Sequence, residues 1–284
     1  MFSYFESTDS KSRINFIELL RAGYRDYVIN ADALSYMVSH GLANAQTAKL
    51  VPLMPAVFEN IDHWKAKLNE LGITGARHIQ IATEGALLGS IFEHGFNRDM
   101  VIISDDAGQF NILNHALCWI HAERTFCKLI GYGDENIQAL ENTRSQIWEL
   151  YARLKEYKES PDDRKKVRIE SQFDQIFTRK TCFASLNQAL KRIYQNKSEL
   201  LLVLDLPDIP LHNNLSERDI REYVKRRKVS GSTRSSPGRK SRDTFTSLKK
   251  TCRKLGVSFW EYVKDRAANL NAVPRLSDLM RAAA

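Results

Sequence analysis

Apolar side chains recur at helical spacing through the second half of the chain, from about Ala122 onward. One helical face is formed by five of them: Ile147, Leu150, Tyr151, Leu154 and Tyr157. The pair Ser160-Pro161 ends this helix and can start the next one. Two more apolar faces follow, at Phe173, Ile176 and Phe177 and at Leu186, Leu190 and Ile193. Residues 200–204 fit either a helix or a strand.

The first part of the chain mixes strands with helices. Aromatic and polar side chains alternate over residues 2–7, which predicts a strand. Ser10 is a candidate cap for a helix over the apolar residues that follow it, Ile14, Phe16, Ile17, Leu19 and Leu20. A mostly helical stretch is predicted to about Leu71, interrupted near Pro52 and Pro55.

A β-branched run at residues 101–103 predicts a short buried strand, because Asp105, Asp106 and Gly108 follow it directly. Residues 115–121 are compatible with another strand. Further on, residues 213–217 open a helix, and two short helices over 244–255 and 258–267 are separated by Gly256. The pattern predicts a mixed α/β fold with more helix than strand.

Charge changes this picture, because the formal net charge of +8 is concentrated in one segment. Residues 218–254 hold fourteen Lys and Arg side chains against three acids, so they carry +11 and the remaining residues −3. Within this stretch, residues 230–242 (SGSTRSSPGRKSR) predict a mobile loop. A basic helix beside a basic loop is typical of binding to phosphate backbones. The alternative is a solvated helix face followed by an exposed loop.

Composition narrows the class of protein further. With 43% hydrophobic and 27% charged residues, the 284-residue chain can form a core, which excludes disordered and low-complexity classes. No apolar run approaches the roughly 18 residues of a membrane span, and the first residues lack the order of a signal peptide. Four cysteines do not make a disulfide framework. We therefore expect a cytoplasmic protein with no membrane partner.

Two acids are candidates for chemistry. Asp105 comes just after its predicted strand, and the ends of strands in α/β sheets are common sites for ligands and metal ions. Its alternative role is a turn or helix-cap aspartate. Glu217 occupies the third helical position if Asn214 is the N-cap, as a capping-box glutamate does. Beside Arg218 and Arg221, it equally suits a metal ion held next to phosphate.

His115, Cys118 and His121 repeat at intervals of three. A zinc site needs about four ligands, and no partner pair with metal spacing exists elsewhere in the sequence. On a strand, Cys118 would face away from both histidines. We expect Cys118 and Trp119 to be buried and His121 to be hydrogen-bonded.

Five segments, in this order, carry a family resemblance: FESTDSKSRINFIELL, VIISDDAGQF, HALCWIHAER, IPLHNNLSERDIREYVKRRKVSG and SLKKTCRKLGVSFWEYV. Together they resemble the catalytic region of the insertion-sequence 66 family of bacterial transposases. The resemblance implies a ribonuclease-H-like fold with an incomplete sheet and a large helical insertion. It also implies an Asp-Asp-Glu triad that binds two Mg²⁺ (or Mn²⁺) ions. The corresponding regions are a partial core at 1–121, the insertion at 122–212 and C-terminal helices at 213–284.

The resemblance assigns roles to individual residues. Asp105 matches the second aspartate of the triad and Glu217 the glutamate, both as metal ligands. Cys118 and His121 match a Cys-x-x-His element that is expected to support the site. The residues expected to bind DNA are all basic: Arg218, Arg221, Lys225, Arg226, Arg227, Lys228, Arg234, Arg239 and Lys240.

The first aspartate of the triad lies upstream of the FESTDSKSR segment in this family. Asp9 and Asp32 are the nearest acids here, and both favour cap or turn positions. We therefore expect a chain without the first two strands and the first metal ligand. The implied function is metal-dependent cleavage and strand transfer of insertion-sequence DNA at the nucleoid, by a homo-oligomer or with an intact transposase. The alternative is an inactive remnant that only binds DNA or an intact transposase.

Overall fold

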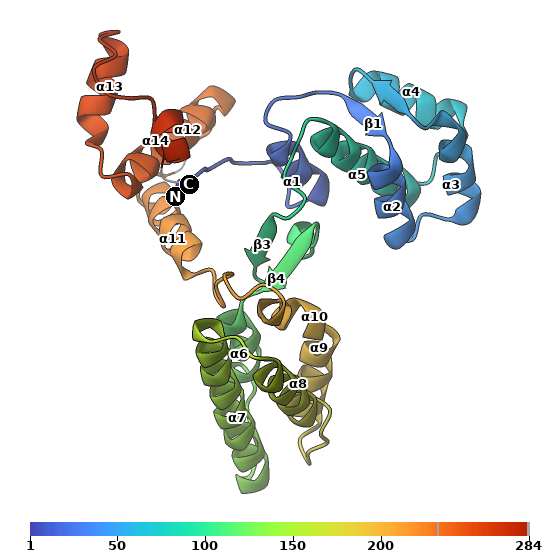
Figure 1. Ribbon diagram of the computed structural model, residues 1–284, viewed down its shortest axis with the longest axis vertical. Helices are drawn as coiled ribbons and strands as arrows, with labels where there is room; N and C mark the ends of the chain where they lie inside the picture. Colours follow the sequence, from blue (N-terminus) through green and yellow to red (C-terminus); the bar gives the residue numbers. More distant parts are fainter. Residues whose placement is uncertain (232, 283–284) are drawn as a thin grey trace. The chain divides into compact units, whose positions relative to one another are not determined.

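The computed structural model describes residues 1–231 and 233–282. The chain forms two compact units (Figure 1): a central unit of residues 11–213, and a terminal unit of residues 1–10 with 214–284. Helices dominate, and the described strands form two two-stranded sheets in the central unit. The expected helix-rich α/β class is confirmed. Among the described helices, none combines the length and the apolar character needed to cross a membrane.

The first half of the central unit surrounds helix α5 (Ala76–Glu93), which is buried without interruption over residues 81–91. Around it lie α1 (Arg13–Leu20), β1 (Tyr27–Ile29), α2 (Ala31–Ser39), α3 (Asn44–Leu50), β2 (Ala56–Phe58) and α4 (Ile61–Glu70). Gly85 permits the close packing of α5 on α2, because a Cβ at this position would lie 2.8 Å from the Ala33 carbonyl oxygen. A helix enclosed on most sides has no polar face, so periodicity did not predict α5.

The helical stretch predicted up to about Leu71 is confirmed by α2, α3 and α4, and its interruption near Pro52 and Pro55 falls between α3 and β2. The antiparallel strands β1 and β2 were not predicted, since three residues are too few for a recognisable alternation. The cap of α1 is Ser12 rather than Ser10, and the Ser12 hydroxyl accepts a hydrogen bond from the Asn15 amide at 3.1 Å.

Strands β3 (Val101–Ser104) and β4 (Asn114–Leu117) pair in parallel, with Ser104 opposite Leu117. The predicted strand at 101–103 is confirmed, but its burial is wrong: only Ser104 is buried, since β3 pairs on one edge alone. The strand predicted at 115–121 ends at Leu117. Cys118 then starts helix α6 (Trp119–Cys127) by accepting the backbone amides of His121 and Ala122.

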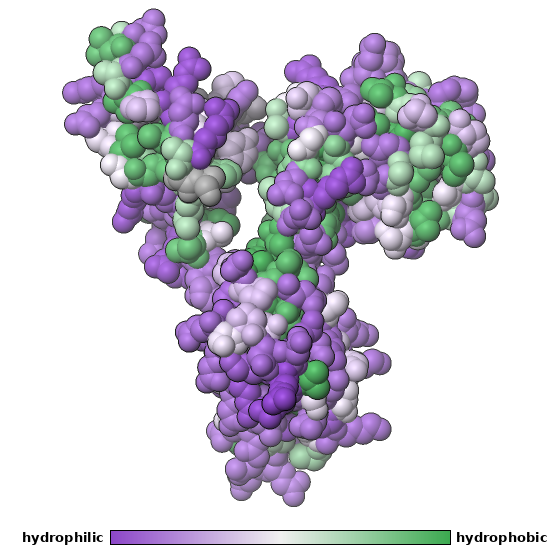
Figure 2. Space-filling model, in the orientation of Figure 1, coloured by the Kyte–Doolittle hydropathy of each residue, from purple (hydrophilic) through white to green (hydrophobic). Residues whose placement is uncertain are grey.

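The second half of the central unit is helical, with α7 (Asp134–Glu159), α8 (Asp163–Phe177), α9 (Ala184–Gln195), α10 (Lys197–Leu200) and a 3-10 turn at Leu202–Leu204. The apolar faces predicted for α7, α8 and α9 are confirmed, because their residues are buried in one cluster. Helical turns also settle the open alternative at residues 200–204. In the view of Figure 2, the outer surface over α7 and α8 is mainly hydrophilic.

The terminal unit contains α11 (Asn214–Val229), α12 (Ser236–Lys254), α13 (Phe259–Ala267) and α14 (Leu276–Ala282). The helices predicted at 244–255 and 258–267 are confirmed, with Gly256 at φ +69° between them. The mobile loop predicted at 230–242 is wrong from Ser236 onward. Ser235 caps α12 and Pro237 occupies its first turn, where a missing N–H costs nothing. Ser232 of that loop lies outside the described residues.

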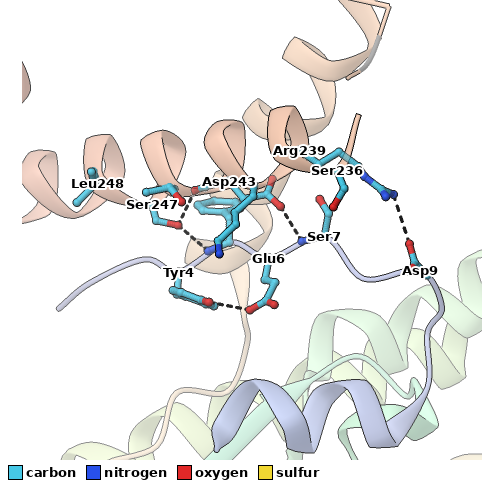
Figure 3. A pocket seen from close by; sticks show the side chains of 12 residues that line it. Tyr4, Glu6, Ser7, Asp9, Ser236, Arg239, Asp243, Ser247 and Leu248 are labelled. Atoms are coloured by element: carbon cyan, nitrogen blue, oxygen red, sulfur yellow. Dashed lines mark hydrogen bonds and ion pairs between the residues drawn. The ribbon is translucent and has the colours of Figure 1, made fainter. Parts of the chain in front are cut away.

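Residues 2–7 run along α12 and do not form the predicted strand (Figure 3). Alternate amides donate to side chains on successive turns of α12: Ser3 to Thr251 (3.1 Å), Phe5 to Ser247 (2.9 Å) and Ser7 to Asp243 (2.7 Å). Two residues of extended chain rise about 6.6 Å and four residues of helix about 6 Å, so the two repeats match over this length. Side chains of α12 therefore accept the backbone amides that a neighbouring β-strand would otherwise accept.

Candidate active site and nucleic-acid interface

Asp105 lies directly after β3, at the end of the strand, as predicted. Its side chain is exposed, and no group among the described residues pairs with its carboxylate. The neighbouring Asp106 differs, because its carboxylate forms an ion pair with the Arg192 guanidinium of α9 at 2.5 Å. The turn expected as the alternative for Asp105 involves only its backbone, whose carbonyl accepts the Ala107 amide at 2.7 Å. The strand end therefore presents one free carboxylate.

A chain of polar contacts leads from the helical half of the central unit to the Asp105 backbone. The Glu199 carboxylate of α10 lies 2.9 Å from His115 Nδ1 on β4, and His115 Nε2 lies 2.8 Å from the Ser104 hydroxyl on β3. Ser104 in turn donates to the carbonyl oxygen of Asp105 at 2.5 Å. The sequence pattern did not predict these contacts, because Glu199 lies 84 positions from His115 along the chain.

A second buried network holds the same turn from the α1 side. Glu84 of α5 is 1% exposed and accepts hydrogen bonds from the Tyr36 hydroxyl at 2.7 Å and from Arg13 Nη1 at 3.3 Å. Arg13 Nη2 also donates to the carbonyl oxygen of Gly108, three residues beyond Asp105, at 2.8 Å. Burial and the hydrogen bond to Glu84 raise the pKa of Tyr36. A single acid inside the apolar run of α5 was the sequence signal for this network.

The two acids nearest to a first triad position are already paired. Asp32 lies in the first turn of α2, and its two carboxylate oxygens accept from the Arg98 guanidinium at 2.5 and 2.8 Å. Asp9, in the terminal unit, lies 3.4 Å from Arg239 Nη1. Asp9 lies in a bend, which agrees with the turn role expected for it, whereas Asp32 lies inside α2, whose N-cap is Asn30.

Cys118 and His121 lie at the junction of β4 and α6. The Cys118 amide donates to the Ser104 carbonyl oxygen at 2.9 Å, which extends the pairing of β4 with β3 by one residue. On a strand Cys118 would face away from His121, but helix α6 begins here and brings the Cys118 Sγ within 4.8 Å of a His121 ring nitrogen. Burial of Cys118 and Trp119 is confirmed, and His121 Nε2 lies 3.2 Å from Arg124.

Glu217 lies in the first turn of α11, with a carboxylate oxygen 4.0 Å from Arg221 Nη2. The helix begins at Asn214 itself, so Glu217 is its fourth residue and not its third. Glu217 belongs to the terminal unit together with the predicted DNA-binding residues. Asp105, Cys118 and His121 belong to the central unit.

The three acids of the basic segment point into the terminal unit. Asp219 forms ion pairs with Lys250 at 3.2 Å and Lys254 at 2.9 Å, Glu222 pairs with Lys250, and Asp243 accepts the Tyr223 hydroxyl. Burial acts to raise the pKa of Asp219, but hydrogen bonds from Lys254, Ser3 and Lys250 outweigh it and lower that pKa to about 2. The acids are therefore occupied in joining α11 to α12.

Most of the predicted DNA-binding residues are exposed. Arg221 lies 4.0 Å from Glu217, Arg226 pairs with Glu222 at 2.9 Å, and Arg239 is half-buried beside Asp9. Six others are exposed without a side-chain partner among the described residues: Arg218, Lys225, Arg227, Lys228, Arg234 and Lys240. Because Asp219 and Asp243 are turned inward, the exposed surface of this segment is more basic than its sequence suggests.

A cavity of about 500 Å³ lies between residues 4–9 and the first half of α12 (Figure 3). Its wall carries charges of both signs, from Glu6, Asp9, Arg239 and Lys240. The Arg239–Asp9 ion pair crosses one end of it. The sequence pattern predicted no cavity here, since it forms only where residues 4–9 lie against the helix.

Comparison with known proteins identifies the family. Residues 89–241 match the family model described as Transposase IS66 family. The chain is 42% identical over 267 residues to an uncharacterized protein, y4jO, of Sinorhizobium fredii (strain NBRC 101917 / NGR234), covering 93% of this chain and 83% of that protein. No solved structure matches the chain. The chain therefore belongs to the IS66 family of transposases.

Proposed function

We propose that this chain is the catalytic region of a DNA transposase with a ribonuclease-H-like fold, which cleaves and joins phosphodiester bonds at insertion-sequence ends. The observation that carries the proposal is the free, exposed carboxylate of Asp105 at the end of β3, inside the region matched by the family model. In this interpretation residues 1–121 are the core, 122–212 the insertion and 213–284 the part that carries Glu217.

The proposed metal ligands are Asp105 and Glu217. Carboxylate oxygens are the ligands that Mg²⁺ and Mn²⁺ prefer, and the unpaired Asp105 is available for such an ion, whereas Asp106 is held by Arg192. When bound, the metal would activate a water molecule or a DNA 3′-hydroxyl and stabilise charge on the phosphate. The Ser104 hydroxyl donates to the Asp105 carbonyl oxygen and Arg13 donates to the Gly108 carbonyl oxygen, so the backbone that carries the Asp105 carboxylate is held at two points.

The exposed basic residues of α11 and α12 would bind the DNA backbone. Arg218, Lys225, Arg227 and Lys228 have no carboxylate partner among the described residues, so they can neutralise phosphates without breaking an ion pair. Such contacts orient DNA and carry little base specificity. Lys250 and Lys254 do not share this role, because Asp219 already pairs with both.

The test of catalysis is cleavage of DNA carrying insertion-sequence ends, with Mg²⁺ or Mn²⁺. Asp105→Asn and Glu217→Gln are expected to abolish cleavage while leaving DNA affinity within twofold. Asp106→Asn is the matched control, since it removes the adjacent carboxylate, which already has a partner. Cleavage that survives in Asp105→Asn, or that is lost equally in Asp106→Asn, contradicts the proposal.

The test of DNA binding is the salt dependence of affinity. The double variant Arg227→Gln with Lys228→Gln is expected to reduce the slope of log K against log salt by about 0.9 for each phosphate that is no longer neutralised. A matched double variant in the central unit, Arg164→Gln with Arg168→Gln, removes the same charge from exposed positions on α8 and should leave the slope unchanged. Equal effects of the two variants would show that net charge alone matters.

A second candidate function is a non-catalytic chain that binds DNA or pairs with an intact transposase. The ion pairs of Asp32 with Arg98 and of Asp9 with Arg239 favour it, because each of these acids has an arginine as its partner. It predicts salt-dependent DNA binding without cleavage under any metal condition. Size-exclusion chromatography of the chain mixed with a full-length family member would then show a mixed oligomer.

A further inference from the structure

Ser104, His115 and Glu199 have the arrangement of a nucleophile, a base and an orienting acid. The hydroxyl-to-Nε2 distance is 2.8 Å and the Nδ1-to-carboxylate distance is 2.9 Å. However, Ser104 is 5% exposed and His115 is 7% exposed, so no substrate reaches the hydroxyl. Ser104 also directs its hydroxyl at the carbonyl oxygen of Asp105. The three side chains therefore form hydrogen bonds that end at the protein's own backbone and not at a substrate.

The protons available to these groups determine how the chain of contacts is held. The Asp105 carbonyl oxygen and the Glu199 carboxylate can only accept, and the Ser104 hydroxyl has one proton, which it donates to Asp105. His115 lies between the other two side chains and contacts each through a different ring nitrogen, Nε2 toward Ser104 and Nδ1 toward Glu199. All three hydrogen bonds thus depend on one another.

The Asp105 side chain has no partner of its own among the described residues, so its direction is set by its backbone. That backbone directly follows β3, a strand with a single neighbour, which by itself is a weak support. The Ser104 hydroxyl and the Ala107 amide both bond the Asp105 carbonyl oxygen, at 2.5 and 2.7 Å. Ser104 is held by β4 and α10 through His115 and Glu199.

We propose that Ser104, His115 and Glu199 are positioning residues that fix the peptide of Asp105 and thereby prepare its carboxylate for a divalent metal ion. This inference rests on the proposed function, since it takes Asp105 as a metal ligand. It also gives the helical half of the central unit a role at the site, because Glu199 lies on α10. Partners of this kind typically contribute about 10- to 100-fold to metal affinity.

The test measures Mn²⁺ affinity of the full chain by electron paramagnetic resonance, with far-UV circular dichroism to verify the fold. Ser104→Ala and Glu199→Ala are each expected to weaken Mn²⁺ binding about 10-fold at a temperature where the fold is intact. Ser104→Thr keeps the hydroxyl and should restore affinity to within about threefold. Glu199 is the safer site for a change, because its side chain is 21% exposed.

Two controls separate the different ways in which the proposal can fail. Asp106→Asn should leave Mn²⁺ affinity unchanged, whereas Asp105→Asn should remove it. If Asp105→Asn has no effect, the metal site of the proposed function is wrong. If Asp105→Asn removes binding but Ser104→Ala and Glu199→Ala leave it unchanged, the positioning role is overturned and the proposed function stands. Loss of affinity in Ser104→Ala that Ser104→Thr does not restore also overturns it.

Discussion

The central unit buries two large clusters of apolar side chains, whereas the described residues of the terminal unit bury only Cys252, Tyr262 and Leu276 in such a cluster. The terminal unit has polar contacts instead: Asp219 and Lys250 join α11 to α12, and Asp243 binds residues of three segments. The terminal unit thus has a basic outer surface, and its few acids form the contacts that hold its own segments together. Its stability should depend on charge, and that of the central unit on packing.

The largest expected effect tests packing in the central unit. Phe173 of α8 is fully buried between Trp119 and Phe177, so Phe173→Ala should lower the free energy of unfolding by about 3–5 kcal/mol through lost burial and a cavity. Val167→Ala, an exposed position on the same helix, should change it by less than about 0.5 kcal/mol. Hydrogen exchange followed by mass spectrometry measures each unit separately. Equal effects of both variants would contradict the assignment of this core.

A smaller effect tests the polar contacts of the terminal unit. Asp243 is 6% exposed and accepts from the Ser7 amide and the Tyr223 hydroxyl. Asp243→Ala leaves these donors without their acceptor, and should cost about 1.5–3 kcal/mol and release residues 1–10 from α12. The expected result is faster hydrogen exchange in residues 1–10 and an unchanged exchange rate in the central unit. Asp278→Ala, at an exposed ion pair on α14, should leave exchange unchanged.

Acid should weaken the terminal unit through Asp219. The pKa of this carboxyl is about 2 in the folded chain against an ordinary value of 3.8, so the unfolded chain binds its proton first as pH falls. The stabilisation is therefore complete above about pH 4 and disappears as pH falls through about 2. Thermal melts between pH 5 and pH 2 should show a shallower decline in Asp219→Asn. An identical decline in both proteins would contradict the role given to Asp219.

The smallest expected effect is that of salt. Raising NaCl from 0.1 to 1 M shortens the screening length from about 10 to about 3 Å, which weakens partly exposed ion pairs such as Glu222–Arg226. The terminal unit should lose less than about 1 kcal/mol, and the central unit should not be weakened. Hydrogen exchange at both salt concentrations measures this. A greater loss in the central unit would reverse the comparison.

Local patterns predicted those parts of the molecule whose cause is local. The apolar faces of α7, α8 and α9 follow from spacing along single helices, and β3 with Asp105 at its end follows from a β-branched run bounded by turn residues. Pattern reasoning failed where a neighbour decides the outcome. Helix α5 is enclosed on most sides, so it shows no polar face, and residues 2–7 bond to a helix more than 200 positions away.

The sequence by itself determined the family, the concentration of positive charge in residues 218–254 and the place of Asp105 at a strand end. Only the tertiary structure decided which charges are free. It turned Asp219 inward, paired Asp106 with Arg192 and left Asp105 unpaired, and it connected Ser104 through His115 to Glu199. Spacing along the chain cannot reveal such pairings, because a charge acts over a few ångströms of space and its partner can lie anywhere in the sequence.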